Sequence, residues 1–324
     1  MADAGSRRWM AVVAVAAVIV AAGAHTNGAP IDEVETQIVD VPPDLAIAEE
    51  PITARTAGLG SAWDLPNLDH SRVEYWVARF DSVPEMRKKF QGFLDRGSTW
   101  APVILEKLEA RDMPRDLLYL AMIESGFNPA AHSHASAAGV WQFIAETGQR
   151  YGLAIDRAVD ERRDPFRATD AALDYLQDLH DRFGSWYLAA AAYNSGENRV
   201  GRAMRAEFGR ERAGTEQDYY RIWNKLPSET RDYVPLMVAA ARITKDPRTY
   251  GFEPMDLRVL EWQEIVATPA TPLIHLAERY GVSVAEIREL NPHFRIDRTP
   301  NNRQYAVRIP LTTTEVAQAS AGIE

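Results

Sequence analysis

Glu124 is the residue whose type and surroundings most directly predict chemistry. It follows an apolar stretch, residues 117–123, that is hydrophobic nearly all round a helix and therefore belongs inside a core. Gly126 comes next but one, a residue type that commonly ends a helix in the left-handed conformation. Burial and the partial negative charge of a helix C-terminus both raise the pKa of a carboxyl group, which then keeps its proton and can act as a general acid. The alternative is a solvated glutamate at a fraying helix end.

A second helix end has the same layout. Residues 186–193 are apolar nearly all round, and Asn194, Ser195 and Gly196 follow them. Two buried helices that each end in polar groups beside a glycine predict a pair of helix ends that face one another. Two independent helix caps are the alternative, because Asn and Gly are ordinary residues at such positions.

The loop between these helices, residues 130–139, is rich in small residues, which let a backbone approach a ligand closely. It contains His132 and His134, but two histidines without a nearby third ligand do not predict a metal site, and no cofactor is expected. The other acids near these motifs are interpreted as solvated or salt-bridged surface groups: Glu146, Asp164 and Glu197.

The elements that must position these residues are mainly helices. Helical spacing of apolar residues, interrupted at Pro84, Gly97 and Pro102, predicts helices over residues 71–80, 84–96, 101–110, 114–124, 170–183, 186–193, 219–226 and 228–243. A linker follows at residues 246–256. The pattern then changes to a strand over 257–267, a short helix between Thr271 and Gly281, a second helix opened by a Ser283–Glu286 capping box, and a closing strand over 305–309. We therefore predict a mainly α protein with a small α+β module at residues 257–311.

Composition limits the function classes. The chain has 324 residues, long enough for two domains, and a net charge of −10, which argues against a nucleic-acid partner because phosphate binding requires a basic surface. Cysteine is absent, which excludes a disulfide framework, a thiolate zinc site and a lipidated N-terminal cysteine, so the protein is not expected to be a lipoprotein.

The first 24 residues have the layout of a secretory signal peptide. Arg7 and Arg8 precede an apolar run, residues 9–22, and the small residues at 22–24 offer a cleavage site. A periplasmic protein is expected, with an uncleaved inner-membrane anchor as the alternative. The acidic, proline-containing residues 25–66 are interpreted as a disordered tether, and residues 312–324 as a tail.

Three separated motifs resemble one known family. In order and spacing, Glu124-Ser125, Gly139-Val140-Trp141-Gln142 and Ala192-Tyr193-Asn194-Ser195-Gly196-Glu197 resemble the soluble lytic transglycosylases, whose goose-lysozyme-like catalytic domain cleaves peptidoglycan. Residues 227–234 are similar to a further Glu-Thr-Arg-x-Tyr-Val element of that family, and the Trp of the second motif is similar to the membrane-bound lytic murein transglycosylase D subfamily. The resemblance implies a lysozyme-like catalytic domain at residues 101–245, preceded by a helical extension at 67–100.

The same resemblance implies the site and the reaction. Glu124 would be the single acid and base, which protonates the leaving glycosidic oxygen and then accepts a proton from the C6 hydroxyl of N-acetylmuramic acid. That hydroxyl attacks C1 of its own sugar, so the product ends in 1,6-anhydro-N-acetylmuramic acid and no second carboxylate is needed. The substrate-binding residues would be Ser125, Gln142, Tyr193, Asn194 and Tyr233.

Residues 276–292 resemble a LysM glycan-binding domain, although Thr271-Pro272-Leu273 replaces the Gly-Asp-Thr-Leu opening usual in that domain. At most modest glycan affinity is expected, and a structural cap on the catalytic domain is the alternative. The predicted partner is the peptidoglycan glycan strand, with cell-wall synthesis or division proteins as further candidates. Two other functions stay open: a hydrolytic muramidase, for which Glu197 is the best second carboxylate, and a non-catalytic peptidoglycan-binding protein.

Overall fold

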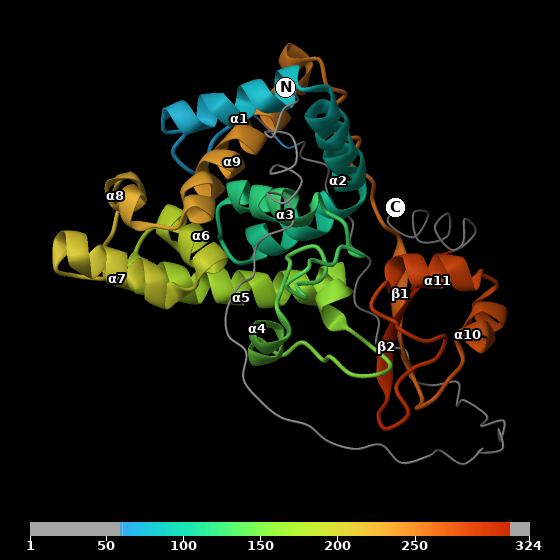
Figure 1. Cartoon of the computed structure of the whole chain (residues 1–324). Helices are drawn as coiled ribbons and strands as arrows, with labels where there is room; N and C mark the ends of the chain where they lie inside the picture. The colour runs from blue at the N-terminus through green and yellow to red at the C-terminus, as the bar shows by residue number, and fades with distance from the viewer. Residues whose placement is uncertain (1–58, 60, 312–324) are drawn as a thin grey trace, which may run out of the picture. The chain divides into compact units, whose positions relative to one another are not determined.

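The computed structural model describes residues 59 and 61–311 (Figure 1). The predicted signal peptide, most of the predicted tether and the predicted tail lie outside these residues. The chain divides into two units, which are described separately. Among the described residues, the first comprises residues 59, 61–261 and 292–295, and the second comprises residues 262–291 and 296–311.

The first unit is helical. Its α-helices are α1 Ser71–Ser82, α2 Pro84–Ala110, α3 Leu118–Ser125, α4 Ala145–Arg150, α5 Pro165–Phe183, α6 Trp186–Ser195, α7 Glu197–Phe208, α8 Glu216–Ile222 and α9 Ser228–Lys245. Short 3₁₀ turns lie at Arg115–Leu117, Glu161–Arg163, Trp223–Lys225 and Pro247–Tyr250. The prediction of a mainly α protein is confirmed.

Helices α3 and α6 form the centre of this unit. Helix α3 packs against α2 and α9, and α6 packs against α5, α7 and α9. The side chains of α3 from Leu118 to Ile123 are buried, as are those of α6 from Tyr187 to Ala192. Both helices therefore lie inside the core, as their nearly continuous apolar sequence predicts.

Helix α2 corrects one prediction. Two helices separated at Gly97 and Pro102 were expected, but α2 is continuous from Pro84 to Ala110. Pro102 has no N–H to offer the carbonyl of Ser98, and that carbonyl instead accepts a hydrogen bond from the backbone N–H of Arg258, at 2.7 Å. Gly97 is buried against Met255 and Phe127, so it allows close packing instead of breaking the helix.

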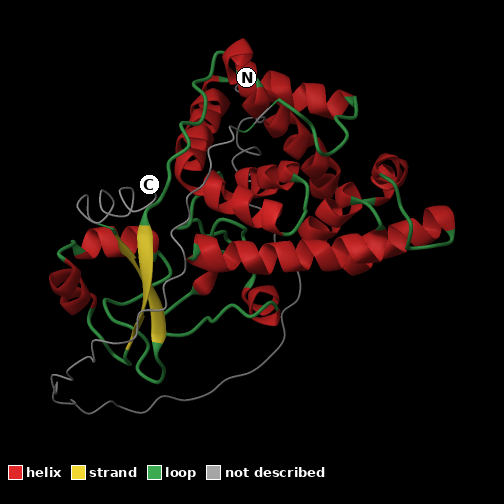
Figure 2. Ribbon diagram, turned by 180° about the vertical axis from the view of Figure 1, so that it is seen from behind, coloured by secondary structure: helices red, strands yellow, loops and turns green. Residues whose placement is uncertain are grey.

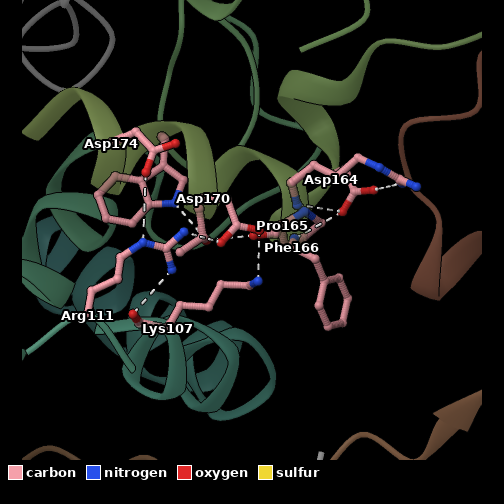
Figure 3. A network of polar contacts seen from close by, with 10 residues as sticks. Lys107, Arg111, Asp164, Pro165, Phe166, Asp170 and Asp174 are labelled. Carbon is pink, nitrogen blue, oxygen red and sulfur yellow. Dashed lines mark hydrogen bonds and ion pairs between the residues drawn. The ribbon is translucent and has the colours of Figure 1, made fainter. Parts of the chain in front are cut away.

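Ion pairs hold α2 against α5 (Figure 3). Asp170 accepts from Lys107 at 2.8 Å and from Arg111 at 2.7 Å. The N-terminus of α5 is capped by Asp164, which accepts from the backbone N–H of Phe166 at 3.0 Å. Because Asp164 is fully buried, its interpretation as a surface group is wrong. It satisfies backbone donors at a buried helix end, which requires a buried acceptor.

The second unit contains strands β1 Trp262–Ala267 and β2 Tyr305–Pro310 and helices α10 Leu273–Tyr280 and α11 Val284–Leu290. The strands, yellow in Figure 2, pair in an antiparallel sheet in which Trp262 is opposite Pro310. The predicted start of the first strand at residue 257 is wrong. Because β2 ends at Pro310, opposite Trp262, residues 257–261 have no partner strand among the described residues. The predicted helix end at Gly281 and the Ser283–Glu286 capping box are both present.

Within the part of the chain that the structure describes, no helix is both long enough and apolar enough to cross a membrane.

Candidate active site

Glu124 lies in the last turn of α3 and is buried, with 7% of its surface exposed. The helix ends at Gly126, which has a φ of +60° and whose missing side chain leaves space for the ring of Phe93. Arg96 of α2 donates from Nε to the carbonyl oxygen of Gly126, at 2.7 Å. The end of α3 is therefore held in place by Phe93 and Arg96 of α2. It is not the solvated, fraying helix end that was the alternative.

The surroundings of Glu124 favour its neutral form. Burial is the largest influence and raises the pKa of Glu124 to about 8. The hydroxyl of Tyr233 donates to Glu124 Oε1 at 2.5 Å, which opposes that rise, and the negative charge of Glu229 adds to it. A carboxyl group with this pKa carries its proton at neutral pH, as a general acid must.

Tyr233 is positioned by α9, which continues through Pro235. The carbonyl of Arg231, which Pro235 leaves without its helical donor, accepts from Trp223 Nε1 at 2.7 Å and from the Tyr219 hydroxyl at 2.9 Å. Burial first, and then the charge of Glu124, raises the pKa of Tyr233 well above its usual value. Tyr233 therefore stays protonated and remains a hydrogen-bond donor.

Tyr193 brings the end of α6 to the same place. Its hydroxyl donates to the carbonyl oxygen of Trp141 at 2.8 Å. Burial and then the charge of Glu124 raise the pKa of Tyr193 well above its usual value. The ends of α3 and α6 are both hydrogen-bonded to one turn, because Ser125 donates to the carbonyl of Val140 and Tyr193 donates to that of Trp141.

The turn at residues 139–142 closes one side of the site. Gly139 has a φ of +82°, and a side chain there would overlap the carbonyl oxygen of Arg162. Gln142 also has a positive φ, +50°, and its amide donates to the carbonyl of Gly139 at 2.8 Å. Ser125 donates from Oγ to the carbonyl of Val140 at 2.8 Å, which joins the turn to the end of α3.

A cleft of about 850 Å³ opens beside Glu124. Ser125 and Gln142 line it, together with the loop residues Asn128, Ala130, Ala131, His132 and Ser133 and one face of α2. The residues around the cleft do not include Tyr193, Asn194 or Tyr233. The structure thus divides the predicted site into three groups: Ser125 and Gln142 in the cleft, Tyr193 and Tyr233 buried near Glu124, and Asn194.

Asn194 belongs to a third group, which contains an acid that sequence reasoning missed. Its Oδ1 accepts from Thr230 Oγ1 at 2.8 Å, and its amide lies 3.5 Å from Glu229 Oε1. Burial raises the pKa of Glu229, and the charge of Glu229 in turn acts on Glu124. The signal was present in the sequence, because Glu229 opens the Glu-Thr-Arg-x-Tyr-Val element that contains Tyr233.

The acid proposed as a second carboxylate occupies another environment. Glu197 lies 3.7 Å from Arg150 and accepts from the Tyr175 hydroxyl at 3.3 Å. This pairing agrees with its interpretation as a salt-bridged group. Glu146 is exposed on α4. In the described residues, no three metal-binding side chains come together, and His132 lies at the cleft wall.

Each of the two units contains a stretch that matches a known protein family. Residues 102–214 match the family model "Transglycosylase SLT domain", and residues 261–322 match "Lytic transglycosylase MltD, LysM-like domain". Membrane-bound lytic murein transglycosylase D of Escherichia coli K12 is 37% identical over 190 residues, which cover 58% of this chain and 41% of the relative. The chain thus spans less than half the length of that relative.

Two solved structures are also similar. An inactive mutant of lytic transglycosylase Slt from Pseudomonas aeruginosa shares 21% identity with a TM-score of 0.35, covering 47% of this chain and 25% of its own. The 70-kDa soluble lytic transglycosylase of Escherichia coli shares 22% identity with a TM-score of 0.36, covering 48% of this chain and 25% of its own. The resemblance predicted from the motifs is confirmed by the family models: residues 102–214 belong to the transglycosylase SLT family, and a LysM-like domain of the lytic transglycosylase MltD type follows them.

Proposed function

We propose that this protein is a peptidoglycan lytic transglycosylase that cleaves the β-1,4 bond between N-acetylmuramic acid and N-acetylglucosamine without water. The observation that carries the proposal is a buried Glu124 with a pKa raised to about 8, hydrogen-bonded to Tyr233 beside a cleft of about 850 Å³. The matches to a transglycosylase SLT domain and to a relative named as a lytic murein transglycosylase support it.

In the first half of the reaction, the protonated Glu124 donates its proton to the leaving glycosidic oxygen. Burial has kept that proton in place, and its loss leaves a carboxylate whose charge the Tyr233 hydroxyl stabilises through its hydrogen bond. In the second half, this carboxylate accepts the proton of the C6 hydroxyl as that hydroxyl attacks C1 of the same sugar. The attacking group is already attached to the substrate, so one carboxyl group serves both steps.

Two of the remaining site residues are proposed to bind and orient the sugar. Ser125 and Gln142 line the cleft next to Glu124 and offer a hydroxyl and an amide to sugar hydroxyl and acetamido groups. Tyr193 and Asn194 do not line the cleft and are proposed to support it, Tyr193 by donating to the Trp141 carbonyl and Asn194 by accepting from Thr230. Tyr233 is a positioning residue for Glu124.

A hydrolytic muramidase is the second candidate, and one observation favours it. Glu229 lies close enough for its charge to raise the pKa of Glu124. A second carboxylate near the acid is what a hydrolase needs to activate water or to form a covalent intermediate. For this second candidate we therefore assign the role to Glu229 instead of Glu197.

The substitution Glu124→Gln tests the proposed function. The amide keeps the shape of the carboxyl group but cannot donate the proton, and general acid–base catalysis alone is typically worth ~10²–10⁴ in rate. A loss larger than this range is expected because one group serves both half-steps, with unchanged thermal unfolding and sacculus binding. Release of muropeptides at more than about a hundredth of the wild-type rate would refute the assignment.

The module at residues 257–311 is proposed to add modest glycan affinity. This is tested in the Glu124→Gln variant, in which sacculus binding can be measured without cleavage. Truncation after Glu261, which keeps Met255 and the Arg258 donor to the Ser98 carbonyl, should weaken sacculus binding while the remaining protein stays folded. Unfolding of the remainder would instead support a structural cap.

We place the protein in the periplasm, where its substrate lies, in keeping with a relative named as membrane-bound. Cell fractionation that finds it in the cytoplasm would contradict this placement.

A further inference from the structure

One wall of the cleft that contains Glu124 is positively charged. Helix α2 contributes Lys88, Lys89 and Arg96 to this wall, and we refer to these three residues as the basic row. All three side chains are exposed. Their spacing along α2 places them on one helix face, with Gly92 between them and no side chain to cover the cleft there.

The basic row differs from the other cations of α2 in having no carboxylate partner. Arg87 pairs with Asp81, and Lys107 and Arg111 both pair with Asp170. Among the described residues, no carboxylate lies within ion-pair distance of Lys88, Lys89 or Arg96. Glu85 lines the same cleft but makes no ion pair with the row in the described part of the chain.

The row has a fixed position relative to the chemistry. Arg96 is hydrogen-bonded to the carbonyl of Gly126, two residues after Glu124. Lys88 and Lys89 precede Arg96 by two turns of the same helix, which puts them roughly 10–12 Å further along the cleft. A ligand group that reaches the lysines therefore lies beside the glycan, at some distance from the bond that is cleaved.

The positive charges also act on one another. Partial burial, and then the charge of Arg96, lowers the pKa of Lys89. A negatively charged ligand group in the cleft would offset this repulsion and would therefore be attracted. In a chain with 36 basic and 46 acidic residues, three cations that lie in one cleft wall without an ion-pair partner among the described residues are a local feature and not a consequence of overall charge.

We propose that the basic row binds the carboxylates of the peptide attached to N-acetylmuramic acid. This inference rests on the proposed function, because it assumes that a glycan strand occupies the cleft. In a peptide-substituted strand, the sugars present neutral hydroxyl and acetamido groups, and the negative charges lie on the peptide. The neutral sugars therefore offer the basic row no charge to pair with, whereas the peptide carboxylates can form charge-assisted hydrogen bonds with it.

The double variant Lys88→Gln/Lys89→Gln tests the row on two substrates that differ in charge alone. One is a peptide-bearing glycan strand, and the other is the same strand with its peptide carboxylates converted to amides. The readout is the ratio of kcat/KM for the first strand to kcat/KM for the second. The wild-type ratio should exceed one, and the double variant should lower it about three- to tenfold, mainly through KM, as expected for exposed charge pairs.

Arg202→Gln/Arg212→Gln is the matched control. Both arginines are exposed, neither lines the cleft, and their replacement changes the net charge by the same amount. This variant should keep the wild-type ratio. High salt should lower the ratio of the wild type and of the control, and should lower that of the double variant less, because that variant keeps only Arg96 of the row.

A double variant that keeps the wild-type ratio would overturn the proposal, and so would one that loses activity on both strands by the same factor. If the wild type cleaves neither strand, the proposed function fails instead. The row is then tested by binding: Lys88→Gln/Lys89→Gln must weaken binding to the carboxylate strand more than to the amidated strand, and equal weakening would refute it.

Discussion

Three influences determine the charge of Glu124. Burial favours the neutral acid, the Tyr233 hydroxyl favours the carboxylate, and Glu229 again favours the neutral acid. The result is a pKa raised to about 8, so Glu124 is protonated below that pH and ionised above it. General-acid catalysis should therefore decline as the pH rises through about 8.

Tyr233→Phe separates these influences. Loss of the hydroxyl removes the contribution that lowers the pKa of Glu124, so the alkaline limb of the kcat/KM profile should move to higher pH. The rate at neutral pH should fall by roughly 10²-fold, because the carboxylate formed in the first half-step loses a charge-assisted hydrogen bond. Profiles of kcat/KM for wild type and variant, measured from about pH 5 to about pH 10 so that they bracket this titration, provide the comparison.

Tyr151→Phe is the control for that experiment, since its hydroxyl donates to Asp178 instead of to Glu124. The control should leave the profile in place. An alkaline limb of Tyr233→Phe that stays fixed or moves to lower pH would show that the hydrogen bond does not tune Glu124.

At the scale of elements, the turn at residues 139–142 is the most tightly constrained part of the site. Gly139 has a positive φ, and the backbone carbonyl of Arg162 occupies the position that a Cβ atom would take. Both the conformation and the available space therefore require glycine. Gly152 has a similar φ, +86°, but no heavy atom within 4 Å of the position a side chain would take. Alanine variants at the two positions therefore distinguish two contributions to the loss of stability: steric overlap, present only at position 139, and the left-handed backbone, present at both.

Gly139→Ala should lower the free energy of unfolding by more than about 3 kcal/mol, because the methyl group must displace the Arg162 backbone. Gly152→Ala should cost only about 1–2 kcal/mol, the cost of the left-handed conformation alone. Urea unfolding of both variants measures the difference. Equal losses would mean that the overlap at Gly139 is relieved without cost.

Much of the element level could be predicted because local residues determine it. Gly126, Gly184 and Gly281 each end a helix, and the Ser283–Glu286 capping box opens one. The continuity of α2 could not be predicted in this way. The donor that satisfies the Ser98 carbonyl is Arg258, which is 160 residues further along the chain, and sequence spacing does not show that contact.

At the scale of the whole molecule, the two family matches, residues 102–214 and 261–322, overlap the predicted catalytic domain at 101–245 and the predicted module at 257–311, and the second match extends into the predicted tail. The predicted boundary at residue 100 falls inside α2, and the site extends beyond the first match in both directions. The basic row precedes that match, and Glu229 and Tyr233 follow it. The motifs identified Glu124 because its helix is locally unusual. Glu229 lies in a recognised motif, but its proximity to Glu124 and the burial of Asp164 depend on contacts between distant segments.

In the proposed reaction, one carboxyl group cleaves the strand and water takes no part. A digest of peptidoglycan in ¹⁸O-labelled water, followed by mass spectrometry of the released muropeptides, tests this directly. We expect 1,6-anhydro-N-acetylmuramic acid ends, each lighter by one water than a hydrolysis product and free of ¹⁸O, with Glu197→Gln largely active. Mainly reducing ends that carry ¹⁸O, or a loss in Glu229→Gln or Glu197→Gln as large as that in Glu124→Gln, would contradict this expectation and identify a hydrolase.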